Sequence, residues 1–316
     1  MYLNKIDFSR LKMITKKLVT VLILMFITAS VFTVLFYKYS LNISGEYKVS
    51  NAAVPPSEAD LKKPLVYIGV ISRYPPNIIY RGYQPLLNYM TSKTGYRFEL
   101  KLSTDYSEAV RMLINGETAA AFLGSYVYLD AHKQYGVLPI LKPLNENFEP
   151  YSRTVLFTKR SSNLYNLKDL KGRRLALPSK ESFSANWLIR HEFPKYGINY
   201  SDLASADNFP HHQSVIYQVY NSYYDAGVTR EFLVKNLPNR DSIRVILYSD
   251  PIPTSPIVVA PNFDASIVSA IKKSLMDVNG RNPAYQIITK EWDSEFIYGF
   301  VEASDSDYNI LRQIGK

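Results

Sequence analysis

A polar loop between a strand and a helix is the part of this chain best suited to chemistry. Residues 178–184 follow the short apolar run Arg174–Leu177 and precede a helical stretch, Ala185–Phe193. The loop carries the hydroxyls of Ser182 and Ser184. Hydroxyls and the backbone N–H groups at a helix start bind anions, although serines there also act simply as N-caps. The pattern predicts either a small-anion site or a capped helix.

Two adjacent histidines, His211 and His212, offer further chemistry. Together with a serine of the loop and Asp225 they supply the residue types of a hydrolase triad. The sequence has no Gly-x-Ser-x-Gly elbow, His-Glu-x-x-His pair or phosphate-binding glycine loop. A histidine pair without a third ligand at suitable spacing does not predict a metal site. We therefore expect a binding protein without metal or cofactor, and a Ser/His hydrolase is the less favoured alternative.

Strands and helices alternate along the chain, as in α/β layers built on parallel strands. Asn77 and Asp105 are the expected N-caps of the first two helices, with Glu108 completing a capping box at the second. The expected strands are 64–71, 98–102, 118–123, 154–158, 175–177, 225–228, 242–248 and 256–260, and the expected helices are 77–94, 105–116, 126–135, 185–193, 215–224 and 265–276.

The same order of elements begins again near residue 154, and the strand at 256–260 returns to the first unit. This predicts a bilobal α/β protein with two crossing strands between the lobes. Lobe 1 comprises residues 65–153 plus 250–316, and lobe 2 comprises residues 154–249. A ligand would bind between them as the lobes close.

The composition is that of an ordered globular protein, with 47% hydrophobic and 21% charged residues. The 316 residues suffice for two core-forming units. The net charge is +9, but the arm at residues 1–17 contains five basic residues and one acid. No run of lysines and arginines is interleaved with aromatic residues as in single-strand binders. We expect no nucleic-acid partner, whereas a mildly basic cleft would suit an acidic ligand.

The segment Leu18–Tyr37 contains 20 residues without a charge, roughly 30 Å of helix and enough to cross a bilayer. The basic arm before it predicts that the N-terminus lies inside and the rest outside. The alternative is a cleaved signal peptide, with small residues at Thr28–Ser30, but secretory apolar regions span only about 7–15 residues. With no cysteine for lipid attachment, we expect an uncleaved transmembrane signal anchor in the inner membrane, a linker at 38–64, and a periplasmic domain at 65–316.

Several motifs from Leu65 to the C-terminus, taken in order, resemble the phosphonate/phosphite-type (PhnD-like) periplasmic solute-binding family, which has the type II periplasmic-binding fold. They are Val66–Ile71, Tyr83–Met90, Asn115–Glu117, Phe122–Gly124, the Leu167–Ala176 run, Asp225–Gly227, Pro251–Pro256 and Gly299–Val301.

The resemblance also implies the ligand-binding residues. It places Tyr128 at the tyrosine after the Leu-Gly turn, Ser182, Phe183 and Ser184 on the anion loop, and His211 or His212 at the ligand-facing histidine. Phe183 stands where the family has threonine. Glu181 adds a carboxylate that is unfavourable beside an anion unless the ligand carries an amine or the side chain points away.

The resemblance implies an exported, membrane-tethered protein that binds a small, anionic, phosphonate-, phosphite- or phosphate-like solute for an ABC-type uptake system. The alternative is a ligand-sensing ectodomain that signals to, or assembles with, a membrane partner. Either output would come from another polypeptide, an ABC permease or a membrane sensor protein.

Overall fold

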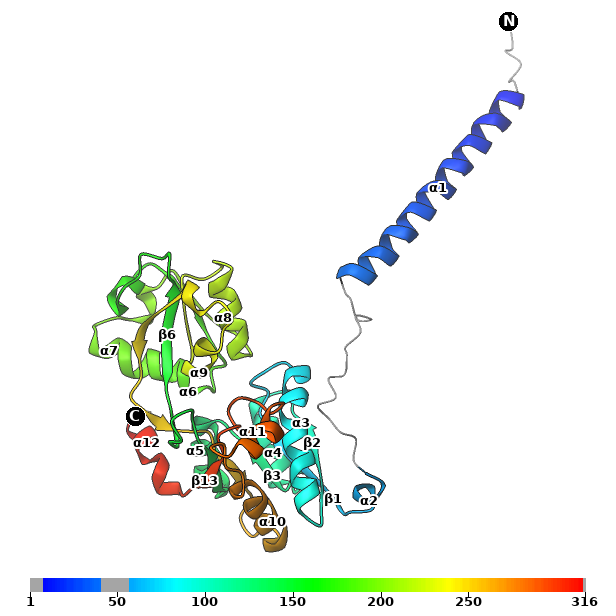
Figure 1. Ribbon diagram of the computed structural model, residues 1–316. Coiled ribbons are helices and arrows are strands. Elements are labelled where there is room, and N and C mark those ends of the chain that lie inside the picture. Colours follow the sequence, from blue (N-terminus) through cyan, green and yellow to red (C-terminus); the bar gives the residue numbers. More distant parts are fainter. Residues whose placement is uncertain (1–7, 41–56, 315–316) are drawn as a thin grey trace, which may run out of the picture. The chain divides into compact units, whose positions relative to one another are not determined.

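The computed structural model describes residues 8–40 and 57–314 of the chain (Figure 1). It divides into two compact units, residues 1–51 and 52–316. The first contains a single described element, helix α1 (Phe8–Ser40). Within the described residues, no helix combines the length and apolar character needed to cross a membrane, so the predicted span at 18–37 is not confirmed. Residues 1–7 of the predicted arm and 41–56 of the predicted linker lie outside the described residues.

The second unit contains a six-stranded sheet in the order β13-β4-β12-β3-β1-β2. Its strands are β1 (Leu65–Val70), β2 (Arg97–Leu102), β3 (Ala120–Phe122), β4 (Leu138–Pro143), β12 (Ile257–Val259) and β13 (Phe300–Glu302). Strands β2, β1 and β3 are parallel, whereas β12 runs antiparallel to β3 and β4. The sheet is therefore mixed, because β12 enters it from the opposite direction after the chain has left it.

A five-stranded sheet in the order β10-β6-β9-β7-β8 forms the other half of this unit. Its strands are β6 (Thr154–Lys159), β7 (Arg174–Leu177), β8 (Ser205–Asn208), β9 (Ala226–Arg230) and β10 (Ile243–Tyr248). Strand β7 pairs in parallel with β8 and β9, and β6 runs antiparallel to β9 and β10. The two connections between the sheets contain β5 (Tyr151–Ser152) and β11 (Ile252–Pro253), which pair antiparallel.

The helices lie close to their expected positions, with additions where the sequence pattern was weak. They are α2 (Glu58–Leu61), α3 (Pro76–Lys93), α4 (Tyr106–Ile114), α5 (Ser125–Tyr135), α6 (Phe183–Asn186), α7 (Phe193–Lys195), α8 (His212–Tyr220), α9 (Glu231–Lys235), α10 (Ala265–Met276), α11 (Pro283–Thr289) and α12 (Asn309–Ile314). Helices α2, α9, α11 and α12 and strands β4, β5, β8, β11 and β13 were not predicted, and α2 lies within the expected linker.

Helix caps explain the small differences at helix starts. Helix α3 begins after Pro75 rather than at Asn77, because proline has a backbone angle already suited to the first helical turn and an N–H is not needed there. Asp105 caps α4 as predicted, accepting a hydrogen bond from the Glu108 backbone N–H at 2.7 Å. The Glu108 carboxylate accepts from the Thr104 N–H, so it does not close the predicted capping box on Asp105.

The helix predicted at 185–193 begins at Phe183 and contains a π-helical segment, Trp187–Glu192, between α6 and α7. The Trp187 indole N–H donates to the Glu192 carboxylate at 3.1 Å. This contact joins the two ends of the widened turn inside the core, because Trp187 is only 1% exposed. The start of the helix, directly after the polar loop, is where the sequence placed a site.

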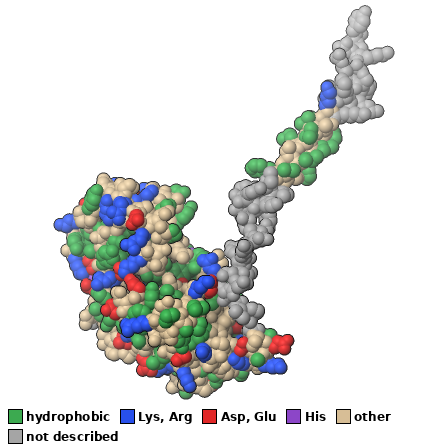
Figure 2. Space-filling model, viewed as in Figure 1, with side chains coloured by type: hydrophobic (Ala, Val, Ile, Leu, Met, Phe, Trp, Pro, Cys, Tyr) green, Lys and Arg blue, Asp and Glu red, His purple; other side chains and the backbone are tan. Residues whose placement is uncertain are grey.

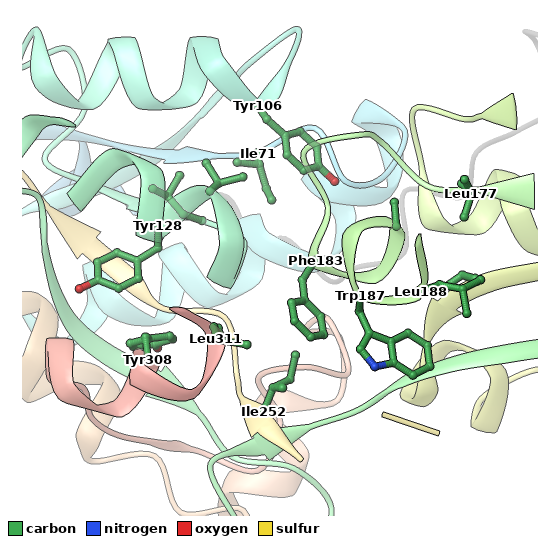
Figure 3. Packing of buried hydrophobic residues seen from close by; sticks show 14 of the residues in the cluster. Ile71, Tyr106, Tyr128, Leu177, Phe183, Trp187, Leu188, Ile252, Tyr308 and Leu311 are labelled. Carbon is green, nitrogen blue, oxygen red and sulfur yellow. The ribbon is translucent and has the colours of Figure 1, made fainter. Parts of the chain in front are cut away.

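One hydrophobic core extends through both sheets of the second unit. It includes Ile71 and Tyr106 from the six-stranded half and Phe183 and Trp187 from the five-stranded half. Figure 3 shows the Phe183 ring beside Trp187 and near Ile252 of β11. This core brings the carboxyl ends of strands from both sheets toward each other, and loops after such strand ends are where open α/β sheets bind ligands.

Gly227 in β9 is expected to tolerate no side chain. A methyl group there would lie 2.7 Å from Val215 Cγ1 and 2.9 Å from Val219 Cγ2 of α8. Because packed interiors yield little, we expect Gly227→Ala to lower the free energy of unfolding by about 1–3 kcal/mol. Urea denaturation measures this effect. Gly95→Ala is the control, because a methyl group at Gly95 meets nothing within 4 Å; equal stability of both variants would contradict the prediction.

Candidate ligand-binding site

A small cavity of about 40 Å³ lies where the loops of the two sheets meet. This volume accommodates a few water-sized groups. Its walls come from the segments after β1, β3, β7 and β9 and from the connections that contain β5 and β11. The residues around it are Ile71, Arg73, Tyr106, Gly124, Ser125, Tyr126, Ser152, Arg153, Thr154, Glu181, Ser182, Phe183, Ser184, His212, Arg230, Ile252 and Ser255.

The serine loop borders this cavity as the sequence predicted. Ser182 caps the helix, since its hydroxyl accepts the Ser184 backbone N–H at 3.2 Å. The Ser184 hydroxyl lies 2.8 Å from that of Thr154 in β6. Both serines are buried, with exposed fractions of 6% and 2%. Capping and lining the cavity occur together, so the two interpretations of the loop do not exclude each other.

His212 is buried behind the serine loop. Its Nε2 lies 3.3 Å from the Ser182 hydroxyl and its Nδ1 lies 3.2 Å from the Thr229 hydroxyl. Burial, followed by the positive charges of Arg230, Arg73 and His211, holds the pKa of His212 well below its usual value. At neutral pH the ring is therefore uncharged. A neutral ring at this position does not offset the charge of an anion.

Three other predicted residues, His211, Glu181 and Phe183, lie at or near the cavity. The His211 Nδ1 lies 2.9 Å from the Ser72 carbonyl in the six-stranded half, and because a carbonyl only accepts, this nitrogen donates. Glu181 lines the cavity, and its carboxylate accepts a hydrogen bond from the Ser107 hydroxyl at 2.9 Å. Phe183 contributes an apolar wall. His211 and Glu181 therefore both connect the two halves of the unit.

Tyr128 does not line this cavity. Its ring is fully buried against Tyr308, with the centroids 4.8 Å apart, and its hydroxyl donates to Asp305. The residues of the same helix that reach the cavity are Ser125 and Tyr126. Tyr128 lies on the same helix as these two residues, but on the face that packs against the C-terminal segment.

The sequence interpretation did not identify the two guanidinium groups of the site. Arg73 follows β1, Arg230 ends β9, and both border the cavity. The two side chains are 3% and 11% exposed. Among the described residues, neither Arg73 Nε nor Arg230 Nη1 has a hydrogen-bond partner. Buried donors are normally satisfied, so these two N–H groups are unused donors at the cavity.

A signal for both arginines was present in the sequence. Each is the first charged residue after a run of apolar or small residues that forms a strand, at 65–72 and 226–229. The carboxyl ends of strands are where open α/β sheets place ligand groups. Only the pairing of the strands shows that these two ends, more than 150 residues apart in sequence, meet at one cavity.

A larger cavity of about 610 Å³ adjoins the small one and shares Ser152, Arg153 and Arg230 with it. Its other walls come from the loop after β4, from α9 and from residues 294–298. An anionic group in the small cavity would thus have space beside it for an organic substituent.

The hydrolase arrangement is not assembled around these residues. Asp225, the candidate acid, pairs with Arg174 at 3.1 Å and accepts the Arg174 backbone N–H. The group beside His212 Nδ1 is the neutral hydroxyl of Thr229, which does not stabilise an imidazolium as a carboxylate does. Among the described residues, no group of three or more acidic, histidine or cysteine side chains is placed to hold a metal ion.

The depressed pKa of His212 predicts an acid sensitivity of folding. As pH falls below about 6.5, the unfolded chain binds a proton on this histidine that the folded chain does not, and stability is lost. Between pH 7 and 5 we expect the native protein to lose about 1–2 kcal/mol more of its unfolding free energy than His212→Gln. Asp293, whose pKa burial raises to about 6, is common to both proteins and cancels. Urea titrations at the two pH values measure the difference; parallel losses would contradict the prediction.

Basic and acidic side chains are mixed on the displayed face of the second unit (Figure 2). Figure 2 shows Lys and Arg side chains interspersed with Asp and Glu over the displayed face of the second unit, without a broad patch of one sign. Many basic side chains are also paired with acids, as in Lys101–Glu117 and Lys235–Glu146. The basic balance of the sequence is thus not gathered on this face.

Solved structures show the same fold. The binding-protein component of an ABC phosphonate transporter from Pseudomonas aeruginosa aligns with a TM-score of 0.70 and 18% identity, covering 80% of this chain and 85% of that one. PhnD1 from Prochlorococcus marinus, in complex with methylphosphonate, aligns with a TM-score of 0.68 and 14% identity, covering 79% and 97%. A Xanthomonas citri protein bound to ATP aligns with a TM-score of 0.63 and 18% identity, covering 80% and 96%. Identities this low show the fold alone.

A family model supplies the assignment that these structures do not. It describes the periplasmic substrate-binding protein of phosphonate ABC transporters and matches residues 68–308, more than half of the chain. The family consists of solute receptors rather than enzymes, and its partner is an ABC permease. The match confirms the resemblance seen in the sequence motifs. This chain belongs to the family of periplasmic substrate-binding proteins of phosphonate ABC transporters.

Proposed function

We propose that the protein binds a small phosphonate-, phosphite- or phosphate-like anion outside the cytoplasm and delivers it to an ABC permease. The observation that carries this proposal is the pair of buried guanidiniums, Arg73 and Arg230, with unpartnered N–H groups beside one small cavity. Arginine suits anions with several oxygens because its donors are fixed in a fork. The hydroxyls of Ser182 and Ser184, which also line the cavity, supply further donors.

Binding would close two lobes, residues 65–153 plus 250–316 and residues 154–249, about the segments that contain β5 and β11. Three contacts support this view because each joins the lobes at the cavity rim: Ser107 with Glu181, Ser72 with His211, and Arg230 with Glu295. An anion between Arg73 and Arg230 would be held by one charge from each lobe. Closure of this kind is the common response of hinged receptors.

The test of this function is a binding screen with phosphonates, phosphite and phosphate. Each true ligand should raise the unfolding free energy in a saturable way, by about 2.7 kcal/mol at a hundredfold excess over Kd. Thermal unfolding and isothermal titration calorimetry measure this. The absence of saturable stabilisation by every member of the series would contradict the proposal.

We further propose that residues 18–37 keep the protein at the membrane. The proposal rests on the 20 uncharged residues of this segment and on the basic residues before it. The apolar side chains of Leu18, Phe26 and Phe32 in α1 are 59%, 76% and 71% exposed, as expected for a helix whose surface would contact lipid. Membrane fractionation with N-terminal sequencing tests the anchor; a soluble mature chain starting near Val31 would contradict it.

A further inference from the structure

A buried carboxylate lies directly behind the two arginines of the site. Glu295 precedes β13, and its side chain is 5% exposed. Arg73 Nη1 donates to one of its oxygens at 2.7 Å, and Arg230 Nη2 donates to the other at 2.7 Å. Burial alone would raise the pKa of Glu295, but the charges of Arg230 and Arg73 outweigh it and hold that pKa below its usual value. The carboxylate is therefore ionised.

The charges around the small cavity nearly cancel. Arg73, Arg153 and Arg230 border it, as does Glu181, while His212 is neutral for the reason given above. Glu295 adds a second negative charge in contact with two of the arginines. These five groups together carry one net positive charge. Asp293, which accepts the Glu295 backbone N–H at 2.9 Å and whose pKa burial raises to about 6, offsets that charge once it is ionised.

We infer that Glu295 makes this site selective for solutes with a net charge of minus one. The inference rests on the proposed function, since it requires an anion in the small cavity. Carboxylates already offset most of the positive charge of the arginines. A second negative charge on the solute therefore gains little attraction and is repelled by the Glu295 carboxylate, which two hydrogen bonds hold in place. Sulfonates, phosphonate monoanions and aminoalkylphosphonates have the required charge.

The size of this effect follows from Coulomb's law in a partly buried site. Two unit charges several ångströms apart interact by a few kcal/mol at an effective dielectric constant of about 20. Removing the charge of Glu295 improves the attraction for a dianion by about twice as much as for a monoanion. Even after screening, the ratio of the two affinities should change roughly tenfold.

Methanesulfonate and methylphosphonate are suitable probes because they have the same shape and three oxygens each. At about pH 9 the sulfonate carries one charge and the phosphonate two, since phosphoryl-type groups lose their second proton near neutrality. We expect the native protein to bind methanesulfonate at least as tightly as methylphosphonate in calorimetric titrations at this pH. Glu295→Gln should shift the affinity ratio roughly tenfold toward methylphosphonate, and Glu295→Asp should leave it near the native value.

Glu117→Gln is the matched control. Glu117 also pairs with a base, Lys101 at 2.6 Å, but it borders neither cavity. Its loss should leave the affinity ratio unchanged, which separates the effect of the Glu295 charge from the general loss of one negative charge.

The outcomes distinguish this inference from the function on which it rests. If the native protein binds none of methanesulfonate, the phosphonates, phosphite and phosphate, the proposed function fails and the inference with it. If it binds phosphite or phosphate but not methanesulfonate, the function stands and the inference is overturned. If it binds methylphosphonate more than about tenfold tighter than methanesulfonate at pH 9, the function stands and the inference is overturned. The same holds if Glu295→Gln leaves the ratio unchanged. Should Glu295→Gln fail to fold, the native comparison alone decides.

Discussion

Replacing Arg230 with methionine is expected to weaken anion binding by at least about 100-fold. The side chain lies at the cavity, and one of its buried N–H groups has no partner among the described residues. Its removal deletes a charge-assisted hydrogen bond, which contributes about 1.5–3 kcal/mol. It also leaves Glu295 with Arg73 as its remaining arginine partner, so the carboxylate repels an anion more strongly. Calorimetric titration with the tightest phosphonate of the screen measures the loss.

Arg174→Met is the control for this prediction. Arg174 also belongs to an arginine–carboxylate pair of the five-stranded sheet, but its side chain is 46% exposed and lies at the start of β7, away from the cavity loop that follows Leu177. Affinity should be unchanged in this variant. Circular dichroism and melting temperature must show that both variants are folded. If folded Arg230→Met binds within threefold of the native protein, Arg230 is not part of the site.

Alanine at Ser182 or Ser184 is expected to weaken binding of the same ligand roughly 10- to 150-fold in each case. If each hydroxyl donates to an oxygen of the anion, its removal leaves a charged acceptor without a donor. Ser182→Ala should also cost about 1 kcal/mol of stability, because its hydroxyl caps the helix. Ser184 does not cap a helix, and its hydroxyl contacts Thr154. Measuring Kd and melting temperature on both variants separates the two roles.

Ser57→Ala provides a matched cap elsewhere in the unit. Ser57 caps α2, accepting the Asp60 backbone N–H at 3.1 Å, and does not border either cavity. It should lower stability slightly and leave affinity unchanged. Unchanged affinity in both loop variants as well would mean that Ser182 and Ser184 are structural and that the arginines bind the anion without them.

Much of the secondary structure followed from local physics. Helix α10 has the predicted bounds, because Asp264 caps it and its apolar residues recur at helical spacing. Strands β1, β7 and β9 were identified from short apolar runs ended by polar residues. By contrast, β4 and β13 were missed: Leu138–Pro143 contains two prolines, and β13 has three residues. These two strands depend on tertiary pairing. Strand β4 lies between β12 and β13, and β13 pairs with β4 at the edge of the sheet.

For the candidate site, too, some residues could be identified from local sequence and others depended on tertiary packing. Ser182, Phe183, Ser184 and Glu181 were found because a loop between a strand and a helix is visible in sequence, and all four border the cavity. Tyr128 was selected from a motif, and the choice of face on α5 was decided by packing against Tyr308. The charge state of His212 could not be read from the sequence, because its pKa depends on burial and on Arg230 and Arg73.

The sequence by itself indicated a bilobal α/β receptor of the phosphonate-binding family with a polar serine loop before a helix. Those features depend on short-range patterns of apolar, polar and capping residues. Tertiary structure decided the electrostatics of the site. Arg73, Arg230 and Glu295 lie far apart along the chain, and only the pairing of strands from two sheets brings their charges within 2.7 Å of each other. The net charge of a buried cavity depends on which side chains lie around it, and contacts between residues far apart in the sequence cannot be predicted from local sequence patterns.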